Sequence, residues 1–318
     1  AGTLLGLSES KAYYNGLLHS SKDALEKAGL KPTQLQAKEA MALTNGTSFM
    51  AALAVFAYKD LNILLKNVSI SAALSLEAIR GEKNAFSKFL NETKPHEGQL
   101  YIAQEIRSLI QDSKRMTCKA QNLRFKWQIQ ETVKERIQDR YSFRAIPQVH
   151  GTLFESLKKL KEVIDIEINS ATDNPLIFID KNGMYKAQSG ANFHGQALSS
   201  VIDYVKITLT SVGLISDKRI FSLLDKYLNY GLPSNLAYDT ASGDTGLMLT
   251  QYASAARAAE SRILSGPASI TSITTSSNQE DFVSMGSIGV LHLHKIIYNI
   301  QLIIAIELLC ALRAIQIT

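Results

Sequence analysis

The stretch from Ser48 to about Gly81 constrains the fold of this chain more than any other part of the sequence. It consists almost entirely of helix-favouring residues, and its apolar positions recur at steps of three and four. These positions wrap most of the way around the expected helix, whereas a surface helix keeps a polar face. The stretch therefore predicts a long helix covered on most sides within a helical bundle.

Composition also favours a mainly helical fold. The chain has 318 residues, of which 46% are apolar, and only six prolines, so long helices are favoured over many short strands. Helices are expected over residues 152–168, over residues 199–225 with a break near Gly213, and from Val290 onwards. Two more are expected within residues 97–138, the second holding Trp127. We expect one small β-hairpin, over residues 176–187, because two short runs flank Asn182-Gly183 there.

The most apolar segment, residues 296–312, is long enough to raise the question of a membrane span. It contains Asn299, Gln301 and Glu307, which a lipid-facing helix rarely tolerates. We interpret it as a buried helix and expect no membrane association.

Charge and cysteine content narrow the possible partners and location. The formal net charge is +5, but 34 basic residues alternate with 29 acidic ones, so no nucleic-acid-binding patch is indicated. Cys118 and Cys310 are too far apart in sequence to suggest a disulfide framework, and no signal-peptide pattern opens the chain. We therefore expect a cytoplasmic protein. No linker or internal repeat is apparent, so residues 1–318 are expected to form one portion without an internal boundary.

The segment from Gln138 to Gly151 concentrates groups that can carry chemistry. It reads Gln-Asp-Arg-Tyr-Ser-Phe-Arg-Ala-Ile-Pro-Gln-Val-His-Gly, and Pro147 and Gly151 are expected to interrupt regular structure. The spacing of three between Tyr141 and Arg144 would place a phenol and a guanidinium on one side of a helical turn. An arginine can bind a carboxylate with two hydrogen bonds, and a tyrosine can transfer a proton. On composition alone, a polar loop over a helical core is the other interpretation.

Several further stretches place polar residues at expected loops and helix ends. They are Lys-Glu-Ala-Met-Ala-Leu-Thr-Asn-Gly-Thr (38–47), Asn-Ser-Ala-Thr-Asp-Asn-Pro-Leu (169–176), Ser-Gly-Ala-Asn-Phe-His-Gly (189–195), Ser-Asp-Lys-Arg-Ile (216–220) and the stretch 266–286, which contains Ser-Ile-Thr-Thr-Ser-Ser-Asn-Gln-Glu-Asp-Phe-Val-Ser-Met. Together with residues 138–151, these stretches resemble, in order, the signatures of the aromatic amino-acid ammonia-lyases, and the histidine ammonia-lyases above all. The departures are small: Ala40 and Ala191 replace glycines, Gln196 replaces a common glutamate, and Phe282 stands where the pattern has histidine.

The resemblance runs along the whole chain and implies the fold of the fumarase/aspartase/ammonia-lyase superfamily. That fold is a homotetramer with a core of long parallel and antiparallel helices, and its active sites are shared between subunits. The family's electrophile, methylidene-imidazolone, forms autocatalytically from an Ala-Ser-Gly that would lie upstream of this chain, and no metal is implied. We therefore interpret the chain as a fragment lacking the N-terminal part and the C-terminal helices, and expect it to be inactive alone.

A second Ala-Ser-Gly occurs inside the chain, at Ala241, Ser242 and Gly243, followed by Asp244. It follows residues 231–235 and so stands too late in the family's order. Ala-Ser-Gly-Asp is also an ordinary loop-to-helix sequence in which serine or aspartate caps the helix. We judge this tripeptide a decoy that does not form the electrophile.

The resemblance also implies roles for individual residues. Arg144 would bind the substrate carboxylate, with Asn45 adding an amide bond. Tyr141 would lie against the electrophile and handle a proton, with Gln138 bonding nearby. Phe193 would line the wall beside the substrate ring. Glu280 would face the ring itself, and a carboxylate there suits an imidazole.

The leading hypothesis is therefore elimination of ammonia from L-histidine to give urocanate. A tyrosine or phenylalanine ammonia-lyase, or a 2,3-aminomutase, remains an alternative, and Phe282 keeps it open. A different class also remains: a catalytically empty helical scaffold that binds an amino acid or only assembles with partners.

Overall fold

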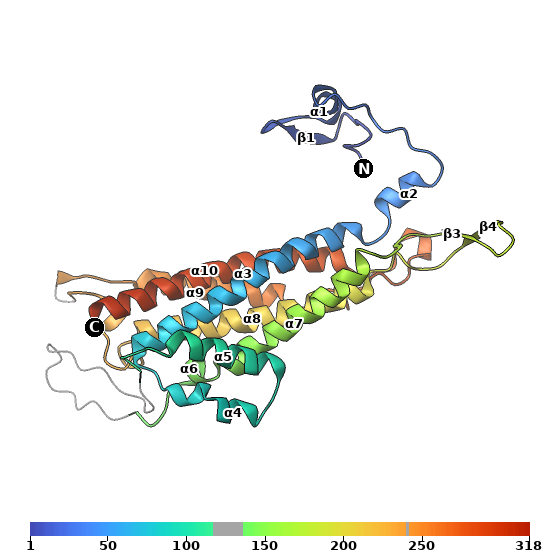
Figure 1. Ribbon diagram of the computed structural model, residues 1–318. Coiled ribbons are helices and arrows are strands. Elements are labelled where there is room, and N and C mark those ends of the chain that lie inside the picture. Colours follow the sequence, from blue (N-terminus) through green and yellow to red (C-terminus); the bar gives the residue numbers. More distant parts are fainter. Residues whose placement is uncertain (117–135, 240–241) are drawn as a thin grey trace. The chain divides into compact units, whose positions relative to one another are not determined.

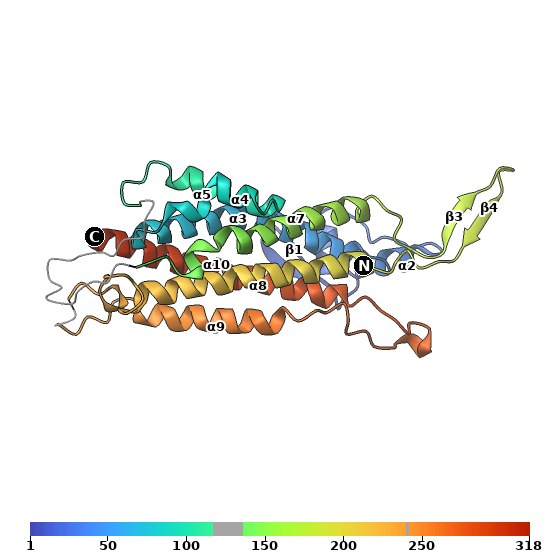
Figure 2. The ribbon, with the colours of Figure 1, turned by 90° about the horizontal axis from the view of Figure 1, so that it is seen from below.

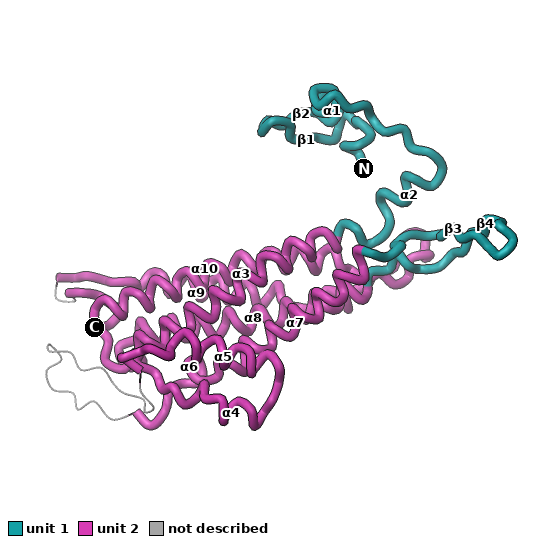
Figure 3. The backbone as a smooth tube through the Cα atoms, in the orientation of Figure 1, with its two compact units in different colours: residues 1–49, 169–195 teal, residues 50–168, 196–318 magenta. Residues whose placement is uncertain are grey.

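A computed structural model describes residues 1–116, 136–239 and 242–318. These residues form two compact units (Figure 3): residues 1–49 with 169–195 make unit 1, and residues 50–168 with 196–318 make unit 2. The expectation of one portion without an internal boundary stays a prediction, and each unit is described here by itself. The helix expected around Trp127 lies outside the described residues.

Unit 1 contains two β-hairpins and two short helices. Strands β3 (Leu176–Ile179) and β4 (Tyr185–Gln188) pair antiparallel, which confirms the hairpin expected from Asn182-Gly183. Strands β1 (Lys11–Tyr14) and β2 (Leu17–Ser20) form a further hairpin, which was not predicted. Its turn residues, Asn15 and Gly16, both have positive φ, as the tight turns of two-residue hairpins require. Helix α1 (Ser21–Lys27) follows, and helix α2 (Glu39–Thr44) ends just before Asn45.

Unit 2 is a bundle of long helices, which confirms the expected mainly helical fold (Figures 1 and 2). Helix α3 also includes the last two residues of the first part of unit 1. The described helices are α3 (Ser48–Ile79), η1 (Lys83–Phe86), α4 (Lys88–Glu92), α5 (Glu97–Ile110), α6 (Tyr141–Arg144), α7 (Ile146–Glu167), α8 (Gln196–Leu224), η2 (Ser234–Leu236), α9 (Met248–Leu264), η4 (Ser276–Asn278) and α10 (Gly286–Ile317).

Helix α8 is the centre of the bundle, and it packs against α7, α9 and α10. Hydrogen bonds between the helices show in which directions they run relative to one another. Ser199 near the start of α8 bonds to Ser284 just before α10, and Arg219 near its end bonds to Glu307 late in α10, so these two helices run parallel. Helix α7 runs antiparallel to α8, because Ser156 midway along α7 bonds to Thr208 while Ser142, before α7 begins, meets Arg219.

Three residues expected to interrupt regular structure, Pro147, Gly151 and Gly213, lie within helices instead. Helix α7 already begins at Ile146, and Pro147 lies in its first turn, where the missing N–H would have no partner within the helix anyway. Gly151 continues the same helix and lets the backbone of Gly98 approach: a Cβ at Gly151 would lie 2.6 Å from the Gly98 carbonyl carbon. Helix α8 passes through Gly213 unbroken, and the Ile300 side chain fills the space that a Cβ would need there.

Three helical stretches, residues 39–79, 196–224 and 286–317, are long and apolar enough to cross a membrane when judged by length and composition alone. In unit 2, however, α8 and α10 bury charged groups against each other. Asn299 and Glu307 are fully buried with polar partners, as expected for residues 296–312. Among the described residues, α3 and α10 keep exposed apolar side chains that no other part covers. Phe56, Ile63 and Ile70 on α3 lie seven positions apart, and on α10 Leu291 and Tyr298 lie seven apart, with Leu312 fourteen further on.

Candidate active site

The turn α6 carries the two side chains that the sequence singled out. The Arg144 guanidinium carbon lies 4.7 Å from the centre of the Tyr141 ring, so the two groups share one side of the turn as their spacing predicted. Tyr141 is 74% exposed. Both residues line an open pocket of about 510 Å³ together with Gln138. The other lining residues are Glu82, Asn84, Ala85, Leu90, Ala145 and Gln148.

Two residues that line this pocket each have a buried polar atom without a hydrogen-bond partner among the described residues. These atoms are Nε of Arg144 and Oε1 of Gln148. A buried donor or acceptor without a partner costs free energy, so native proteins rarely leave one unless a ligand or water completes it. The lining thus includes a guanidinium, which can donate to a carboxylate, and an amide, which can bond an amino or amide group.

The segment before α6 is held by a buried ion pair. Arg136 Nη2 lies 3.2 Å from Asp139 Oδ1, while Asp139 Oδ2 accepts a 2.7 Å hydrogen bond from the Glu82 N–H. Burial raises the pKa of Asp139, and the charge of Arg136 and the Glu82 N–H only partly oppose that rise. Arg136 also donates to the carbonyls of Ile79 and Arg80 at the end of α3. Gln138 thus lies between Arg136 and Asp139, both of which are bonded to the rest of unit 2.

The turn α6 itself rests on a second buried pair, Arg219 and Glu307. Arg219 donates two hydrogen bonds to the Glu307 carboxylate, of 2.5 and 3.0 Å, and both side chains are completely buried. Its remaining terminal nitrogen donates to the Ser142 carbonyl at 3.1 Å, and Ser75 on α3 also donates to Glu307. Three helices, α3, α8 and α10, therefore hold the turn that carries Tyr141 and Arg144.

Glu280 lies at the other end of unit 2. It follows η4 in the segment between α9 and α10, where its carboxylate accepts a 2.9 Å hydrogen bond from the Thr275 hydroxyl. The separation of Glu280 from Arg144 follows from contacts along α8. Ser199 of α8 contacts Ser284 near Glu280, and Arg219 of α8 contacts Ser142 beside Tyr141. Twenty residues at about 1.5 Å each correspond to about 30 Å. Within one chain, therefore, Glu280 cannot reach a substrate bound at Arg144.

Asn45 and Phe193 belong to unit 1. Asn45 is exposed at the end of α2 with an extended backbone. Phe193 is half-buried in the segment before α8. Their predicted roles remain predictions, since nothing places them at the pocket on α6.

The internal Ala-Ser-Gly is described only in part, because Ala241 lies outside the described residues. The Ser242 hydroxyl donates to the Asp239 carbonyl, and Gly243 has φ +83°. Asp244 accepts hydrogen bonds from the backbone of Tyr238 and Gly246, which lower the pKa of its carboxyl. Ser242 and Asp244 here serve a turn before α9, which agrees with the decoy interpretation without testing it.

The model of the family described as aromatic amino acid lyase matches residues 1–318. The chain belongs to this family. It is 41% identical to histidine ammonia-lyase 2 of Fusobacterium nucleatum subsp. nucleatum over 308 residues, covering 97% of this chain and 57% of that protein. The fold matches histidine ammonia-lyase from Trypanosoma cruzi with a TM-score of 0.84 at 33% identity, covering 99% of this chain and 56% of that one. It matches a mutant tyrosine aminomutase with a TM-score of 0.88 at 33% identity, covering 99% and 60%.

The chain thus spans less than two thirds of the length of each of these aromatic amino acid lyase relatives and structural neighbours. Sequence reasoning overlooked Glu82, Asn84 and Gln148 in the pocket, and Arg219 beneath it. The sequence could have indicated a partner such as Arg219, because Glu307 is a carboxylate within an apolar helix and needs a cation beside it when buried. Among the described residues, no group of three or more His, Cys, Asp or Glu could hold a metal.

Proposed function

We propose that this aromatic amino acid lyase chain is part of a histidine ammonia-lyase, which converts L-histidine to urocanate and ammonia. The observation that carries the proposal is the pocket on α6, where the Arg144 guanidinium has a buried Nε without a partner beside the exposed Tyr141. The 41% identity to a histidine ammonia-lyase supports histidine as the substrate.

The pocket residues fit methylidene-imidazolone, the electrophile of this family. Gln138 and Tyr141 line the pocket, and their amide and hydroxyl groups are donors suited to the carbonyl of such a ring. When bound, this group supplies an electron-poor carbon that makes the amino group of the substrate a better leaving group. The Ala-Ser-Gly that forms it is proposed to lie upstream of this chain, so Tyr141 and Gln138 would hold it in the complete enzyme.

The residues of this chain would bind and orient the amino acid. Arg144 binds the α-carboxylate through the paired N–H donors of its guanidinium. Asn45 contributes an amide hydrogen bond to the same carboxylate. Tyr141 handles a proton during loss of ammonia, in which the amino group leaves the α-carbon and a proton leaves the β-carbon. Fixing the carboxylate aligns both breaking bonds with their catalytic groups.

Specificity would come from Glu280 of another subunit. Because Glu280 lies about 30 Å along α8 from Arg144, a site that contains both residues must combine chains. The uncovered apolar stripes on α3 and α10 are suitable surfaces for such an assembly. We therefore propose a homotetramer in the cytoplasm, with Phe193 lining the wall beside the substrate ring and Glu280 facing the imidazole.

The second candidate is a tyrosine or phenylalanine lyase or a 2,3-aminomutase. The structural likeness to a tyrosine aminomutase and the presence of Phe282 favour it. The deciding experiment compares kcat/KM of the complete enzyme for L-histidine, L-tyrosine and L-phenylalanine, and identifies each product. Urocanate as the dominant product supports the proposal, whereas a β-amino acid establishes a mutase. No turnover of any of the three, with the electrophile shown by intact mass, would contradict both candidates.

A matched pair of variants tests the role of Arg144. Arg144→Lys retains the charge but loses the planar donor pair, so kcat/KM should fall by about ten- to a hundredfold. Arg140→Lys makes the same change four residues earlier, outside the pocket, and should stay within about twofold of the parent. Equal losses in both variants would remove Arg144 from the site.

A further inference from the structure

The segment from Gly266 to Met285, which links α9 to α10 and carries Glu280, is braced across its width. Near the tip, the backbones of Thr275 and Glu280 exchange hydrogen bonds. Further back, the Val283 N–H donates to Ser272 Oγ at 2.9 Å. The position of Glu280 is therefore coupled, contact by contact, to the base of this segment.

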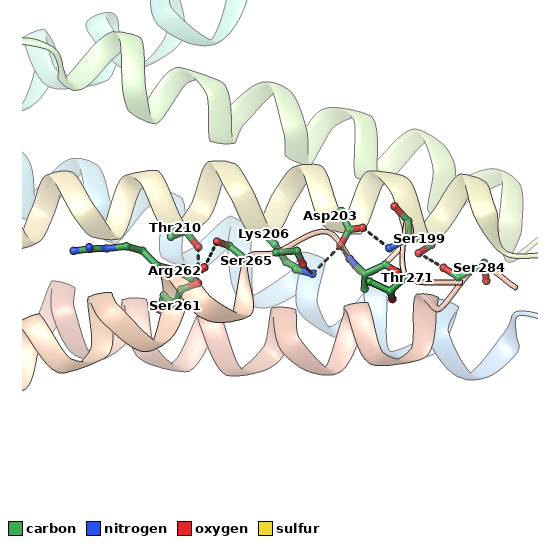
Figure 4. Close-up of polar contacts among 12 residues, drawn as sticks. Ser199, Asp203, Lys206, Thr210, Ser261, Arg262, Ser265, Thr271 and Ser284 are labelled. Atoms are coloured by element: carbon green, nitrogen blue, oxygen red, sulfur yellow. Dashed lines mark hydrogen bonds and ion pairs between the residues drawn. The ribbon is translucent and has the colours of Figure 1, made fainter. Parts of the chain in front are cut away.

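The base is held by one face of α8 (Figure 4). Asp203 Oδ1 accepts from the Ala268 N–H at 3.0 Å, and Asp203 Oδ2 accepts from the Ser269 N–H at 2.8 Å. Lys206, one turn further along α8, donates to Asp203 Oδ1 and to the Gly266 carbonyl. On the returning side, the Ser199 hydroxyl donates to the Ser284 carbonyl at 2.6 Å.

Both charged groups are buried: Lys206 is 0% exposed and Asp203 4%. Packing alone does not require a charged pair here, since apolar residues of similar volume often stabilise a buried position equally well. Hydrogen bonds are directional, so they hold the bonded backbone in one position, whereas apolar contacts allow it to shift. Burial raises the pKa of Asp203, but the bonds from Lys206, Ser269 and Ala268 outweigh it and lower the pKa below its ordinary value. The carboxylate is thus retained as an anion that orients three donors.

We propose that Asp203 and Lys206 are positioning residues for substrate recognition, because they fix the base of the segment that presents Glu280. The pair never touches the substrate and acts through the braces at Ser272–Val283 and Thr275–Glu280. This inference rests on the proposed function, in which Glu280 faces the substrate ring. It adds a pair of α8 residues to the groups that determine specificity.

The first test needs no catalysis. Hydrogen exchange, read by mass spectrometry on the complete protein, compares Asp203→Asn with Asp217→Asn. Asp217 is a matched control, because it is a buried aspartate on the same helix that instead accepts a hydrogen bond from Ser254 on α9. Asp203→Asn should speed exchange at residues 266–285 by roughly ten- to a hundredfold. Asp217→Asn should leave exchange in that segment unchanged. Equal exchange in both variants would overturn the proposal.

A second variant tests the other member of the pair. Lys206→Met removes the bonds to Asp203 Oδ1 and to the Gly266 carbonyl but leaves Asp203 its two backbone donors. It should speed exchange in the same segment by a smaller factor. A Lys206→Met protein with parent-like exchange would contradict a positioning role for the lysine.

The third test separates positioning from general stability. The readout is the ratio of kcat/KM for histidine to that for phenylalanine, measured in Asp203→Asn, Glu280→Gln and the double variant. If Asp203 acts through Glu280, each single change should lower the ratio, and the double variant should fall no further than Glu280→Gln alone. Additive losses would show that Asp203 acts elsewhere. If no variant or parent turns over histidine, the proposed function fails, while the exchange result still decides the structural role of the pair.

Discussion

At the residue scale, the pocket on α6 is defined by groups whose bonding is incomplete. Arg144 and Gln148 both line this pocket, and Arg144 Nε and Gln148 Oε1 lack partners among the described residues. Arg219 is completely buried, and it donates hydrogen bonds to Glu307, Ser142 and Ser216. This contrast distinguishes an arginine available to a ligand from one that supports the structure.

The first prediction concerns Glu280 in the complete enzyme. Glu280→Gln should reduce kcat/KM for histidine by about ten- to a hundredfold, because a carboxylate makes a charge-assisted bond to imidazole that an amide cannot match. The rates for phenylalanine and tyrosine should stay equal or rise, since a carboxylate facing a benzene ring is unpaired. Steady-state kinetics with the three amino acids measures this. A parent that prefers tyrosine, with the same ranking in the variant, would contradict the assignment to histidine.

The second prediction concerns His150, which is completely buried with neither ring nitrogen bonded among the described residues. Burial, and then the charge of Arg219, lower its pKa well below the ordinary value of 6.5. Below about pH 6.5, His150 therefore takes up a proton in the unfolded chain but stays neutral in the folded chain. Stability should fall by up to about 1.4 kcal/mol per pH unit as the pH drops from there towards the folded pKa.

His150→Phe should remove this slope, and urea unfolding between pH 7 and pH 5 measures it. His96→Phe is the control, because His96 is exposed before α5 and its replacement should leave the slope of the parent unchanged. A His150→Phe protein that loses stability with acid as steeply as the parent would show that other groups dominate.

At the element scale, α6 is too short to hold its own conformation, and an isolated four-residue turn is unstable in water. It is fixed instead from both sides, by Asp139 through Glu82 and by Arg219 through the Ser142 carbonyl. Four helices converge on the pair Arg219–Glu307, so the geometry of the pocket depends on the bundle as a whole.

The third prediction separates stability from positioning at this pair. Arg219→Met alone leaves Glu307 buried and unpaired, and should reduce the free energy of unfolding by about 3–5 kcal/mol. The double variant Arg219→Met/Glu307→Leu should recover most of that loss, since an apolar pair can replace a buried ion pair. The kcat/KM of the double variant should stay below that of the parent, because the Ser142 carbonyl still lacks the donor that Arg219 supplied. Urea unfolding and kcat/KM provide the two readings, and recovery of both together would assign the pair to stability alone.

At the scale of the whole molecule, α3 and α10 carry apolar side chains that nothing else in the described part of the chain covers. The seven-residue steps among them on α3 are typical of helices that pack lengthwise against other helices. In the proposed assembly, different chains would bring Arg144 and Glu280 together, since the two lie about 30 Å apart along α8.

The fourth prediction follows from that separation. Arg144→Ala and Glu280→Gln proteins, each with strongly reduced activity, should regain activity when mixed under conditions that exchange subunits. With random mixing, about a quarter of the sites would combine an intact Arg144 with an intact Glu280. The recovered rate on histidine measures this, and mixing two preparations of Arg144→Ala serves as the control. Mixed tetramers that form but recover nothing would contradict a shared site.

The sequence by itself determined the helical class, the hairpin at residues 176–187, the pairing of Tyr141 with Arg144 and the family. These depend on local periodicity, turn residues and the order of motifs, all of which are written along the chain. Only the tertiary structure decided that Pro147 and Gly151 lie within α7, that Gly213 does not break α8 and that Glu280 lies far from Arg144. It alone paired Arg219 with Glu307 and tied Asp203 and Lys206 to residues 266–269. The physical reason is that the cost of a glycine, a proline or a buried charge depends on the neighbour brought against it by folding, and that neighbour is often many residues away in sequence.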